Sequence, residues 1–262
     1  MIDYRDITAA LQRLGVKKGD ICLFHSSFKS LGPVDGGAVA VIRGFEEAVG
    51  EEGTVVVPTL CSQDFENSYK TWHLDKPSDV GYLTEYFRKL PGSLRSDHAT
   101  HSVAARGKLA LELTKEHAAF GPHYCPFGEY AFADSSPWTK MYRYNAKIVF
   151  LGVNMRYNTM KHMIEGWFVD QVLAACPEEK RQAQLDKLVF FGKDGGVRMF
   201  VNMVKMQAHF ENLGLVRQTT CGDATLLCID AKPCHDIMLE AALNHPELCF
   251  DEARIQWIND CK

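Results

Sequence analysis

Hydrophobic and polar positions follow two different periods along the first sixty residues. Over residues 3–14, apolar side chains recur every three or four positions, which predicts an amphipathic helix. The short apolar runs Ile21–His25 and Thr54–Pro58 have the length and composition of buried strands. A second helical stretch, Ala38–Val49, separates them. A strand, a helix and a further strand in this order indicate parallel pairing in an α/β sheet.

The pattern continues through the rest of the chain. Lys147–Val153 is the clearest buried strand, Ala224–Ile229 is another, and the glycine-rich stretch 192–196 between two apolar runs predicts a hairpin turn. Further helices are expected over residues 81–90, 137–142, 158 onward, 203–213, 231–242 and 250–258. Residues 104–114 start with small side chains and turn helical around Leu109, Leu111 and Leu113. No repeat, low-complexity tract or linker divides the chain. We therefore expect one domain over residues 1–262, with a largely parallel or mixed central sheet flanked by helices.

Composition is that of an ordinary globular protein. Hydrophobic residues make up 46% and charged residues 24% of the chain, and the net charge is -4, so we expect no nucleic-acid partner. No apolar run approaches the roughly 18 residues of a membrane span, and the polar start does not resemble a signal peptide. The nine scattered cysteines are expected to be free thiols in a cytoplasmic protein.

Candidate chemistry lies where the first predicted strand ends. His25, Ser26 and Ser27 follow its apolar run, and Lys29 and Ser30 come before the next helix in a Gly-rich loop. Ligands of parallel α/β sheets bind beyond the carboxyl ends of the strands, and free N–H groups at a helix N-terminus attract phosphate. This stretch is a candidate ligand cradle, and a plain strand-to-helix turn with capping serines fits the same pattern.

Two pairs of residues, each with at least one histidine, are further candidates. The stretch Leu94–Ala105 contains His98 and His101 between an Arg-Ser pair and a run of small residues. Histidine is the side chain best suited to moving protons near neutral pH, so His98 is a candidate general base. His162 and Glu165 are spaced three apart and share one face of their expected helix.

Taken in order, these and other short segments resemble the aminoglycoside 3-N-acetyltransferase family. The resemblance covers about residues 14–224 and rests on Leu14-Gly15-Val16, His25-Ser26-Ser27, Leu31-Gly32, Gly36-Gly37, Gly53-Thr54, Pro58-Thr59, Phe87-Arg88, Arg95-Ser96-Asp97-His98, Ser102-Val103-Ala104-Ala105-Arg106-Gly107, Ser135-Ser136-Pro137, Leu151-Gly152-Val153, Asn158-Thr159 with His162 and Glu165, and Phe210-Glu211. Each segment is weakly specific alone, whereas their shared order is strongly specific.

The resemblance implies an α/β enzyme that moves an acetyl group from acetyl-coenzyme A to an amine, such as the 3-amino group of 2-deoxystreptamine in an aminoglycoside. It implies that His98 is the general base and that Glu165 orients it. Such a base removes the proton that an ammonium must lose before it attacks a thioester, an assistance worth about 10²–10⁴ in rate. We expect acetyl-coenzyme A and a small amine as partners, no metal, no membrane, and a monomer or homodimer.

Residue types and the resemblance together place further contacts. Those expected along the coenzyme are His25, Ser26, Ser27, Lys29, Ser30, Ser96, Ser102 and Val103. Those expected near the amine are Asp64, Asp134, His162 and Glu165, because a polycationic acceptor needs an acidic site. The stretch Phe200–His209 lacks the acidic residues that often precede Phe-Glu in aminoglycoside-modifying members. An amine other than an aminoglycoside is therefore a second candidate acceptor.

Three other functions fit parts of the sequence. The nitrogen and oxygen donors of a zinc-dependent hydrolase could come from four residues, namely His98, His101, His162 and Glu165. A ping-pong transferase could use Cys61 as its nucleophile. A non-catalytic protein that binds a small molecule is the third alternative.

Overall fold

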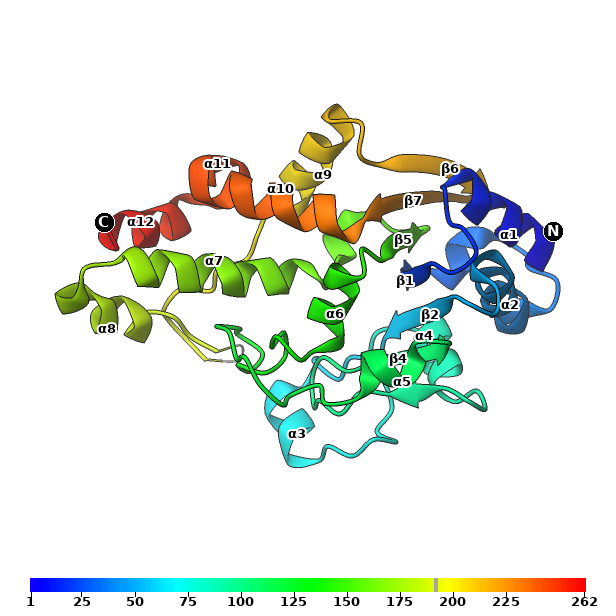
Figure 1. Ribbon diagram of the computed structural model, residues 1–262, viewed down its shortest axis with the longest axis horizontal. Coiled ribbons are helices and arrows are strands. Elements are labelled where there is room, and N and C mark those ends of the chain that lie inside the picture. Colours follow the sequence, from blue (N-terminus) through cyan, green and yellow to red (C-terminus); the bar gives the residue numbers. More distant parts are fainter. Residues whose placement is uncertain (191–192) are drawn as a thin grey trace.

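A seven-stranded mixed sheet runs through the computed structural model, which describes residues 1–190 and 193–262 (Figure 1). The strand order is β3-β4-β2-β1-β5-β7-β6. At its centre, β1 (Ile21–Ser26) pairs in parallel with β2 (Thr54–Pro58) and with β5 (Lys147–Leu151). The outer strands pair antiparallel and are β3 (Leu94–Arg95), β4 (Val103–Gly107), β6 (Arg217–Cys221) and β7 (Ala224–Asp230).

The central strands are apolar throughout because both faces of the sheet are covered. Leu23 and Ile148 point into one hydrophobic cluster, while Phe24 and Val149 point into the other. Side chains alternate between the faces of a strand, so a strand buried on both sides shows a continuous apolar run rather than an alternating one. This is why the sequence reveals β1, β2 and β5 directly.

Helices cover the two faces unequally. One face carries α1 (Tyr4–Arg13), α2 (Gly37–Val49) and α4 (Tyr82–Arg88). The other packs against α5 (Ala110–Thr114), α6 (Pro137–Arg143), α7 (Lys161–Ala175), α9 (Met203–Asn212) and α10 (Ala231–Asn244). The remaining helical segments are α3 (Phe65–Lys70), α8 (Glu178–Asp186), α11 (Pro246–Cys249), α12 (Glu252–Asp260) and the 3-10 turns η1 (Phe28–Leu31) and η2 (Met155–Tyr157).

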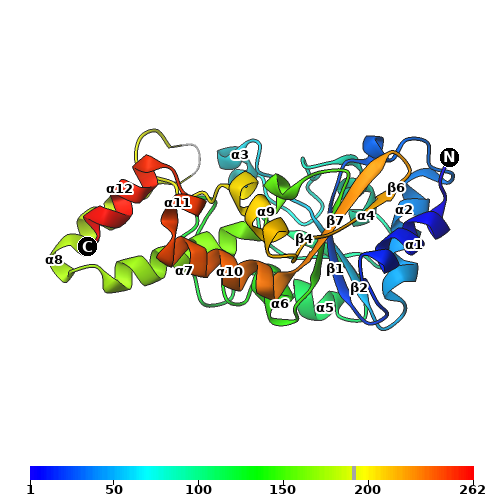
Figure 2. The ribbon, with the colours of Figure 1, turned by 90° about the horizontal axis from the view of Figure 1, so that it is seen from above.

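The molecule is elongated by its longest helices. In both views α7 and α10 run side by side away from the sheet, and α8 and α12 lie at the far end from the N-terminus (Figures 1 and 2). The start of α7 nevertheless lies close to the sheet, since η2 follows directly on β5. The first turn of α7 is thus brought to the edge of the sheet where the parallel strands end.

The predicted fold class is confirmed, and most elements lie where the hydrophobic pattern places them. The stretch 104–114 turns helical at Ala110, close to where it was expected, but its first residues belong to the strand β4 (Val103–Gly107), which was not predicted. The expected hairpin around residues 192–196 is wrong in its pairing, because Leu188 and Val197 form an isolated parallel bridge, whereas a hairpin pairs antiparallel strands. Residues 191 and 192, where the first expected strand runs into the turn, lie outside the described residues.

Two further properties concern solvent and redox state. No helix in the described part of the chain is long and apolar enough to cross a membrane. All nine cysteines are described, and each is buried and unpaired, as expected for free thiols.

Candidate active site

The predicted ligand cradle forms one wall of a pocket at the carboxyl ends of the parallel strands. The pocket has a volume of about 450 Å³ and is lined by His25, Ser26, Ser27, Phe28, Lys29, Pro58, Leu60, Val80, Gly81, Tyr82, Thr84, Val153, Tyr157 and Thr159. Four of the eight residues expected along the coenzyme are among these. This is the edge at which α/β sheets bind ligands.

Ser30 has a structural role beside this pocket. Its hydroxyl donates to the carbonyl oxygens of Ser27 (2.7 Å) and Gly152 (3.2 Å), which ties η1 to the end of β5. A Cβ at Gly152 would lie 2.0 Å from the Ser30 hydroxyl, and this glycine has φ of 65°. Only glycine allows so close an approach in that conformation. Ser30 also lines an adjoining pocket of about 710 Å³ that shares Ser27 with the first.

His25 is a neutral, buried ring in the cradle. It is 5% exposed and stacks on Phe150 with ring centroids 5.4 Å apart. Burial lowers its pKa to about 3, and its Nε2 has no hydrogen-bond partner among the described residues. The side chain therefore presents an uncharged imidazole to the pocket.

The other residues expected along the coenzyme are turned inward. Ser96, Ser102 and Val103 are fully buried. The Ser96 hydroxyl accepts from the Val103 N–H (2.9 Å) and bonds to the His117 ring, and the Ser102 hydroxyl donates to Thr59 O (2.9 Å). The hydroxyl groups of Ser96 and Ser102 are thus bound within the protein, and none of the three residues lines the pocket at the strand ends.

His98 is a buried hydrogen-bond acceptor through Nδ1. The ring is 7% exposed, and Nδ1 accepts from the backbone N–H groups of Thr100 (3.2 Å) and His101 (3.1 Å). A neutral imidazole that accepts at one nitrogen carries its hydrogen on the other, so Nε2 is a donor. Burial lowers the pKa of His98 to about 4. The ring stacks on His117 (4.8 Å) and borders a separate pocket of about 560 Å³ together with Tyr69, Trp72, Asp97, Ala99, Ala118, Gly128, Glu129, Tyr130 and Phe190.

Glu165 is buried on α7 and held by three groups. Its Oε2 lies 2.5 Å from Nδ1 of His162, and its Oε1 accepts from Lys161 Nζ (3.2 Å) and from the Val201 N–H (2.7 Å). Burial alone would raise the pKa of Glu165, but the charges of His162 and Lys161 and these hydrogen bonds outweigh it and lower the pKa to about 2. Glu165 is therefore a carboxylate across the whole range in which an enzyme would work.

The partner of Glu165 differs from the one expected. The sequence pairs this carboxylate with His98, whereas the structure pairs it with His162. The hydrogen bond to Glu165 fixes the hydrogen of His162 on Nδ1, and Nε2 takes no hydrogen bond from the residues that the structure describes. A carboxylate-held imidazole with a free second nitrogen is the arrangement of a general base.

His162 lies close to the first pocket. Its backbone N–H donates to Thr159 O (3.3 Å), and Thr159 lines that pocket. The rings of Phe127 (5.0 Å) and Phe200 (5.5 Å) flank the imidazole. This apolar surrounding lowers the pKa of His162 through desolvation, and the negative charge of Glu165 opposes the effect. The ring is therefore neutral, and able to accept a proton, at neutral pH.

The two aspartates expected near the amine are engaged elsewhere. Asp64 caps α3 by accepting from the Asn67 N–H (3.3 Å). Asp134 lies 3.4 Å from Nε2 of His123 and 3.5 Å from Arg143. Neither carboxylate contacts the His162–Glu165 pair, so their expected role in acceptor binding has no counterpart in the hydrogen bonds of the described residues.

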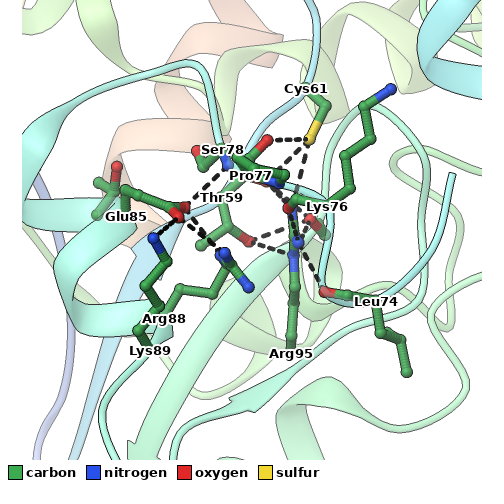
Figure 3. Close-up of polar contacts among 12 residues, drawn as sticks. Thr59, Cys61, Leu74, Lys76, Pro77, Ser78, Glu85, Arg88, Lys89 and Arg95 are labelled. Atoms are coloured by element: carbon green, nitrogen blue, oxygen red, sulfur yellow. Dashed lines mark hydrogen bonds and ion pairs between the residues drawn. The ribbon is translucent and has the colours of Figure 1, made fainter. Parts of the chain in front are cut away.

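The residues of the alternative functions are also distributed differently. The four expected zinc ligands fall into two hydrogen-bond networks, one around His98 and one around Glu165. Within residues 1–190 and 193–262, no group of three or more suitable side chains converges to hold a metal ion. Desolvation raises the pKa of the Cys61 thiol even though the Arg95 guanidinium lies beside it (Figure 3), and a neutral thiol is a weak nucleophile.

Several pocket residues were missed at the sequence level. Tyr82 and Tyr157 are large exposed aromatics at the pocket, and the Tyr82 ring contacts that of Phe28 in a tilted arrangement with centroids 5.4 Å apart. The available signal is weak: Tyr82 follows Gly81 at the start of α4, and Tyr157 lies just beyond the end of β5. Only their positions, just after a loop or a strand, indicate from the sequence that these tyrosines could line a pocket.

Sequence comparison relates most of the chain to one family. The profile of the aminoglycoside 3-N-acetyltransferase family matches residues 23–242. An aminoglycoside N(3)-acetyltransferase III of Salmonella sp. is 33% identical over 176 residues, which are 61% of this chain and 58% of that enzyme. An enzyme of the same name from Serratia marcescens is 29% identical over 209 residues, 73% of this chain and 71% of the enzyme. The chain thus matches 58% of the length of the Salmonella relative.

Solved structures show the same architecture. AAC-IIIb in binary complex with CoASH superposes with a TM-score of 0.70 at 19% identity, over 92% of this chain and 96% of that one. The aminoglycoside acetyltransferase AAC(3)-IVa without ligand gives a TM-score of 0.72 at 18% identity, over 98% and 96%. A mutant of AAC(3)-IVa in complex with apramycin gives 0.67 at 19% identity, over 94% of each chain. At these identities the likeness is one of fold.

Proposed function

The chain belongs to the aminoglycoside 3-N-acetyltransferase family, and from this membership we propose that it transfers an acetyl group from acetyl-coenzyme A to an amine, with His162 as the general base and Glu165 as the carboxylate that orients it. The acceptor class is an aminoglycoside, at the 3-amino group of its 2-deoxystreptamine ring, or a related amine. The relatives are named as aminoglycoside N(3)-acetyltransferases, which supports acetyl transfer to an amine of this class.

One observation carries the proposal: His162, three residues after the pocket residue Thr159, is held by the buried carboxylate of Glu165. The acetyl-coenzyme A arm would occupy this pocket with its thioester toward Thr159. The acceptor ammonium gives its proton to Nε2 of His162, and the nitrogen lone pair then attacks the thioester carbon. The negative charge of Glu165 stabilises the imidazolium formed in this step. The C–S bond breaks as the amide forms, the imidazolium returns its proton to the departing coenzyme A sulfur, and the remaining extra proton on the nitrogen passes to solvent.

The base is assigned to His162 rather than to His98 for a geometric reason. Two backbone N–H groups occupy Nδ1 of His98, so its free nitrogen is a donor and no lone pair is available on the ring. In His162 the hydrogen is on Nδ1, which donates to the Glu165 carboxylate, so the lone pair of Nε2 is available. Base assistance of this kind contributes about 10²–10⁴ in rate. His98 would then act at the edge of the acceptor side, where its Nε2–H can donate.

Release of coenzyme A thiol tests the proposal. Wild-type protein is incubated with acetyl-coenzyme A and a panel of aminoglycosides, polyamines and simple monoamines, and the product is identified by mass spectrometry. We expect thiol release that depends on an acceptor, with one acetyl group on a product nitrogen. Thiol release that ignores the acceptor, or none despite saturation with acetyl-coenzyme A, would overturn the proposal.

A further inference from the structure

The chain between β2 and α4 forms a loop with a closed neck. Residues 59–79 leave the end of β2 and return beside it, where the Asp79 N–H donates to Leu60 O (3.0 Å) and the Ser78 hydroxyl donates to the same oxygen (3.0 Å). The Gln63 N–H donates to the Asp79 carboxylate (2.9 Å). The segment contains the short helix α3, and a connection of this length inside a compact domain is commonly functional.

Arg95 fills the inside of this loop (Figure 3). Its guanidinium donates to six acceptors on the loop and the adjoining strand: Thr59 O (2.7 Å), Thr59 Oγ1 (3.2 Å), Cys61 Sγ (3.4 Å), Leu74 O (2.7 Å), Lys76 O (2.5 Å) and Ser102 Oγ (3.0 Å). It also lies 4.7 Å from the centre of the Trp72 ring. These acceptors are carbonyls, hydroxyls and a sulfur, so the guanidinium orients backbone rather than neutralising a carboxylate. A lysine has three donors at one point and cannot reach this set.

A second set of contacts holds the last residues of the loop against α4. The Ser78 N–H donates to Oε2 of Glu85 (2.9 Å), and Arg88 and Lys89 bind the same carboxylate at 2.7 Å. Burial would raise the pKa of Glu85, but the hydrogen bonds from Arg88, Lys89 and Ser78 lower it to about 2. The loop is therefore fixed from β3 by Arg95 and from α4 by Glu85 (Figure 3).

The loop contributes to two pockets at once. At its neck, Leu60 and Val80 line the pocket at the strand ends. Farther along, Tyr69 and Trp72 line the pocket beside His98. Tyr69 donates its hydroxyl to Phe127 O (2.7 Å), and Trp72 donates its indole N–H to Asp97 (2.7 Å). Any shift of the loop thus changes the walls of both pockets.

We propose that Arg95 is a positioning residue of the transfer reaction, whose guanidinium holds the loop 59–79 so that a single segment forms a wall of both the coenzyme pocket and the pocket beside His98. The inference rests on the proposed function. Arg95 lines neither pocket, so it acts through Leu60 and Trp72. Its loss weakens binding of both substrates, while the His162–Glu165 pair on α7 keeps its geometry.

Replacement by lysine tests this role. For Arg95→Lys we expect the KM values for acetyl-coenzyme A and for the acceptor each to rise about tenfold or more, because lost charged hydrogen bonds of this kind are worth a factor of ten or more, while kcat stays within about threefold. Trypsin should cut the variant faster after Lys70, which lies at the exposed end of α3. A fall in kcat with both KM values unchanged would overturn the proposal, as would wild-type KM values with unchanged cleavage.

Two further variants separate this role from general loss of structure. Arg43→Lys is the matched control, because Arg43 also lies over an aromatic ring (Tyr4, 3.7 Å) but sits on α2 away from the loop, and we expect it to leave both KM values unchanged. Glu85→Gln weakens the contact between the loop and α4. We expect it to raise both KM values and the rate of cleavage after Lys70, by a smaller factor than Arg95→Lys does. This variant keeps the test decisive if Arg95→Lys does not fold. A Glu85→Gln variant with wild-type KM and cleavage would then contradict the proposal.

Failure of the proposed function would be distinguishable from failure of this inference. If the wild-type protein releases no thiol with any acceptor, the proposed function fails. The rate of cleavage after Lys70 does not depend on activity, so it still reports whether Arg95 holds the loop. Equal cleavage rates in the wild type and Arg95→Lys would show that it does not.

Discussion

Nδ1 of His162 and Oε2 of Glu165 lie 2.5 Å apart on the first turn of α7. Glu165 is 1% exposed, and its other oxygen is bound by Lys161 and by the Val201 N–H. The carboxylate therefore cannot rotate away from the imidazole without breaking two further hydrogen bonds. The pair is a rigid unit, and its charge and orientation lead to specific expectations.

Removing the charge of Glu165 should impair catalysis more than binding. In Glu165→Gln the amide still fills the site, but it no longer stabilises an imidazolium at His162. We expect kcat to fall by at least about tenfold, within the range for general-base assistance, with the KM for acetyl-coenzyme A little changed. Steady-state thiol release measures both, and Glu112→Gln, an exposed ion-pair residue of α5, is the control. A kcat within twofold of wild type would contradict this role.

The pH dependence of kcat/KM should reflect the lowered pKa of His162. The base must be neutral to act, and desolvation holds its pKa below the ordinary value of 6.5. We therefore expect activity to be lost only as the pH falls below about 6.5, with a flat profile through neutral pH. Glu165 raises the pKa of His162, so Glu165→Gln should move the acidic limb to still lower pH. An acidic limb centred above pH 7 would be inconsistent with this assignment.

His98 should be needed for structure more than for proton transfer. His98→Ala leaves the N–H groups of Thr100 and His101 without their acceptor, which should cost about 1–3 kcal/mol of unfolding free energy. In His98→Asn the side-chain oxygen can accept in place of Nδ1, so we expect higher stability than in His98→Ala and a kcat within about tenfold of wild type. Urea denaturation and thiol release check the two parts. A folded His98→Asn protein without turnover would restore His98 as the base.

Acidification should lower the unfolding free energy already at pH values well above those at which carboxylates titrate. Burial lowers the pKa of His25 to about 3 and those of His98 and His235 to about 4, against 6.5 when unfolded. Between these values the unfolded chain binds more protons, so the unfolding free energy falls as the pH drops below about 6.5. Each such histidine contributes up to about 1.4 kcal/mol per pH unit.

One histidine acts in the opposite sense. The hydrogen bond with Asp170 raises the pKa of His123, so its contribution is present below pH 6.5 and is lost as the pH rises through the folded-state pKa. The lowered pKa values of His25, His98 and His235 outweigh it, and those of His101, His117 and His162 act in the same direction. Urea unfolding at pH 7, 6 and 5 should show steadily decreasing stability, and a constant unfolding free energy over this range would contradict the reasoning.

The fold was readable from the sequence where burial leaves a simple pattern. β1, β2 and β5 are covered on both faces and appear as continuous apolar runs. β4 was not predicted, because its buried residues Val103, Ala104 and Ala105 are small and are followed by helix-forming sequence. β6 was missed since its burial alternates with polar side chains such as Gln218. Both are outer strands of the sheet, and pairing rather than composition defines them.

The site was readable in part for similar reasons. The cradle from His25 to Lys29 follows from the rule that ligands bind where parallel strands end. Glu165 was also singled out, but its partner was expected in the distant loop that holds His98. The local signal, a histidine three residues earlier on the same helix face, points to His162, the residue with which the structure pairs it. Arg95 carries no such signal, because its role depends on carbonyl groups that only the folded loop brings together.

The central claim is that His162 is the base in acetyl transfer. The most direct measurement is kcat for thiol release by His162→Ala at pH 7.5, with the acceptor found for the wild type and with circular dichroism to confirm the fold. The account predicts a fall of at least about 10², while an exposed control, His245→Ala, keeps wild-type turnover. A folded His162→Ala protein with kcat within threefold of wild type would contradict it.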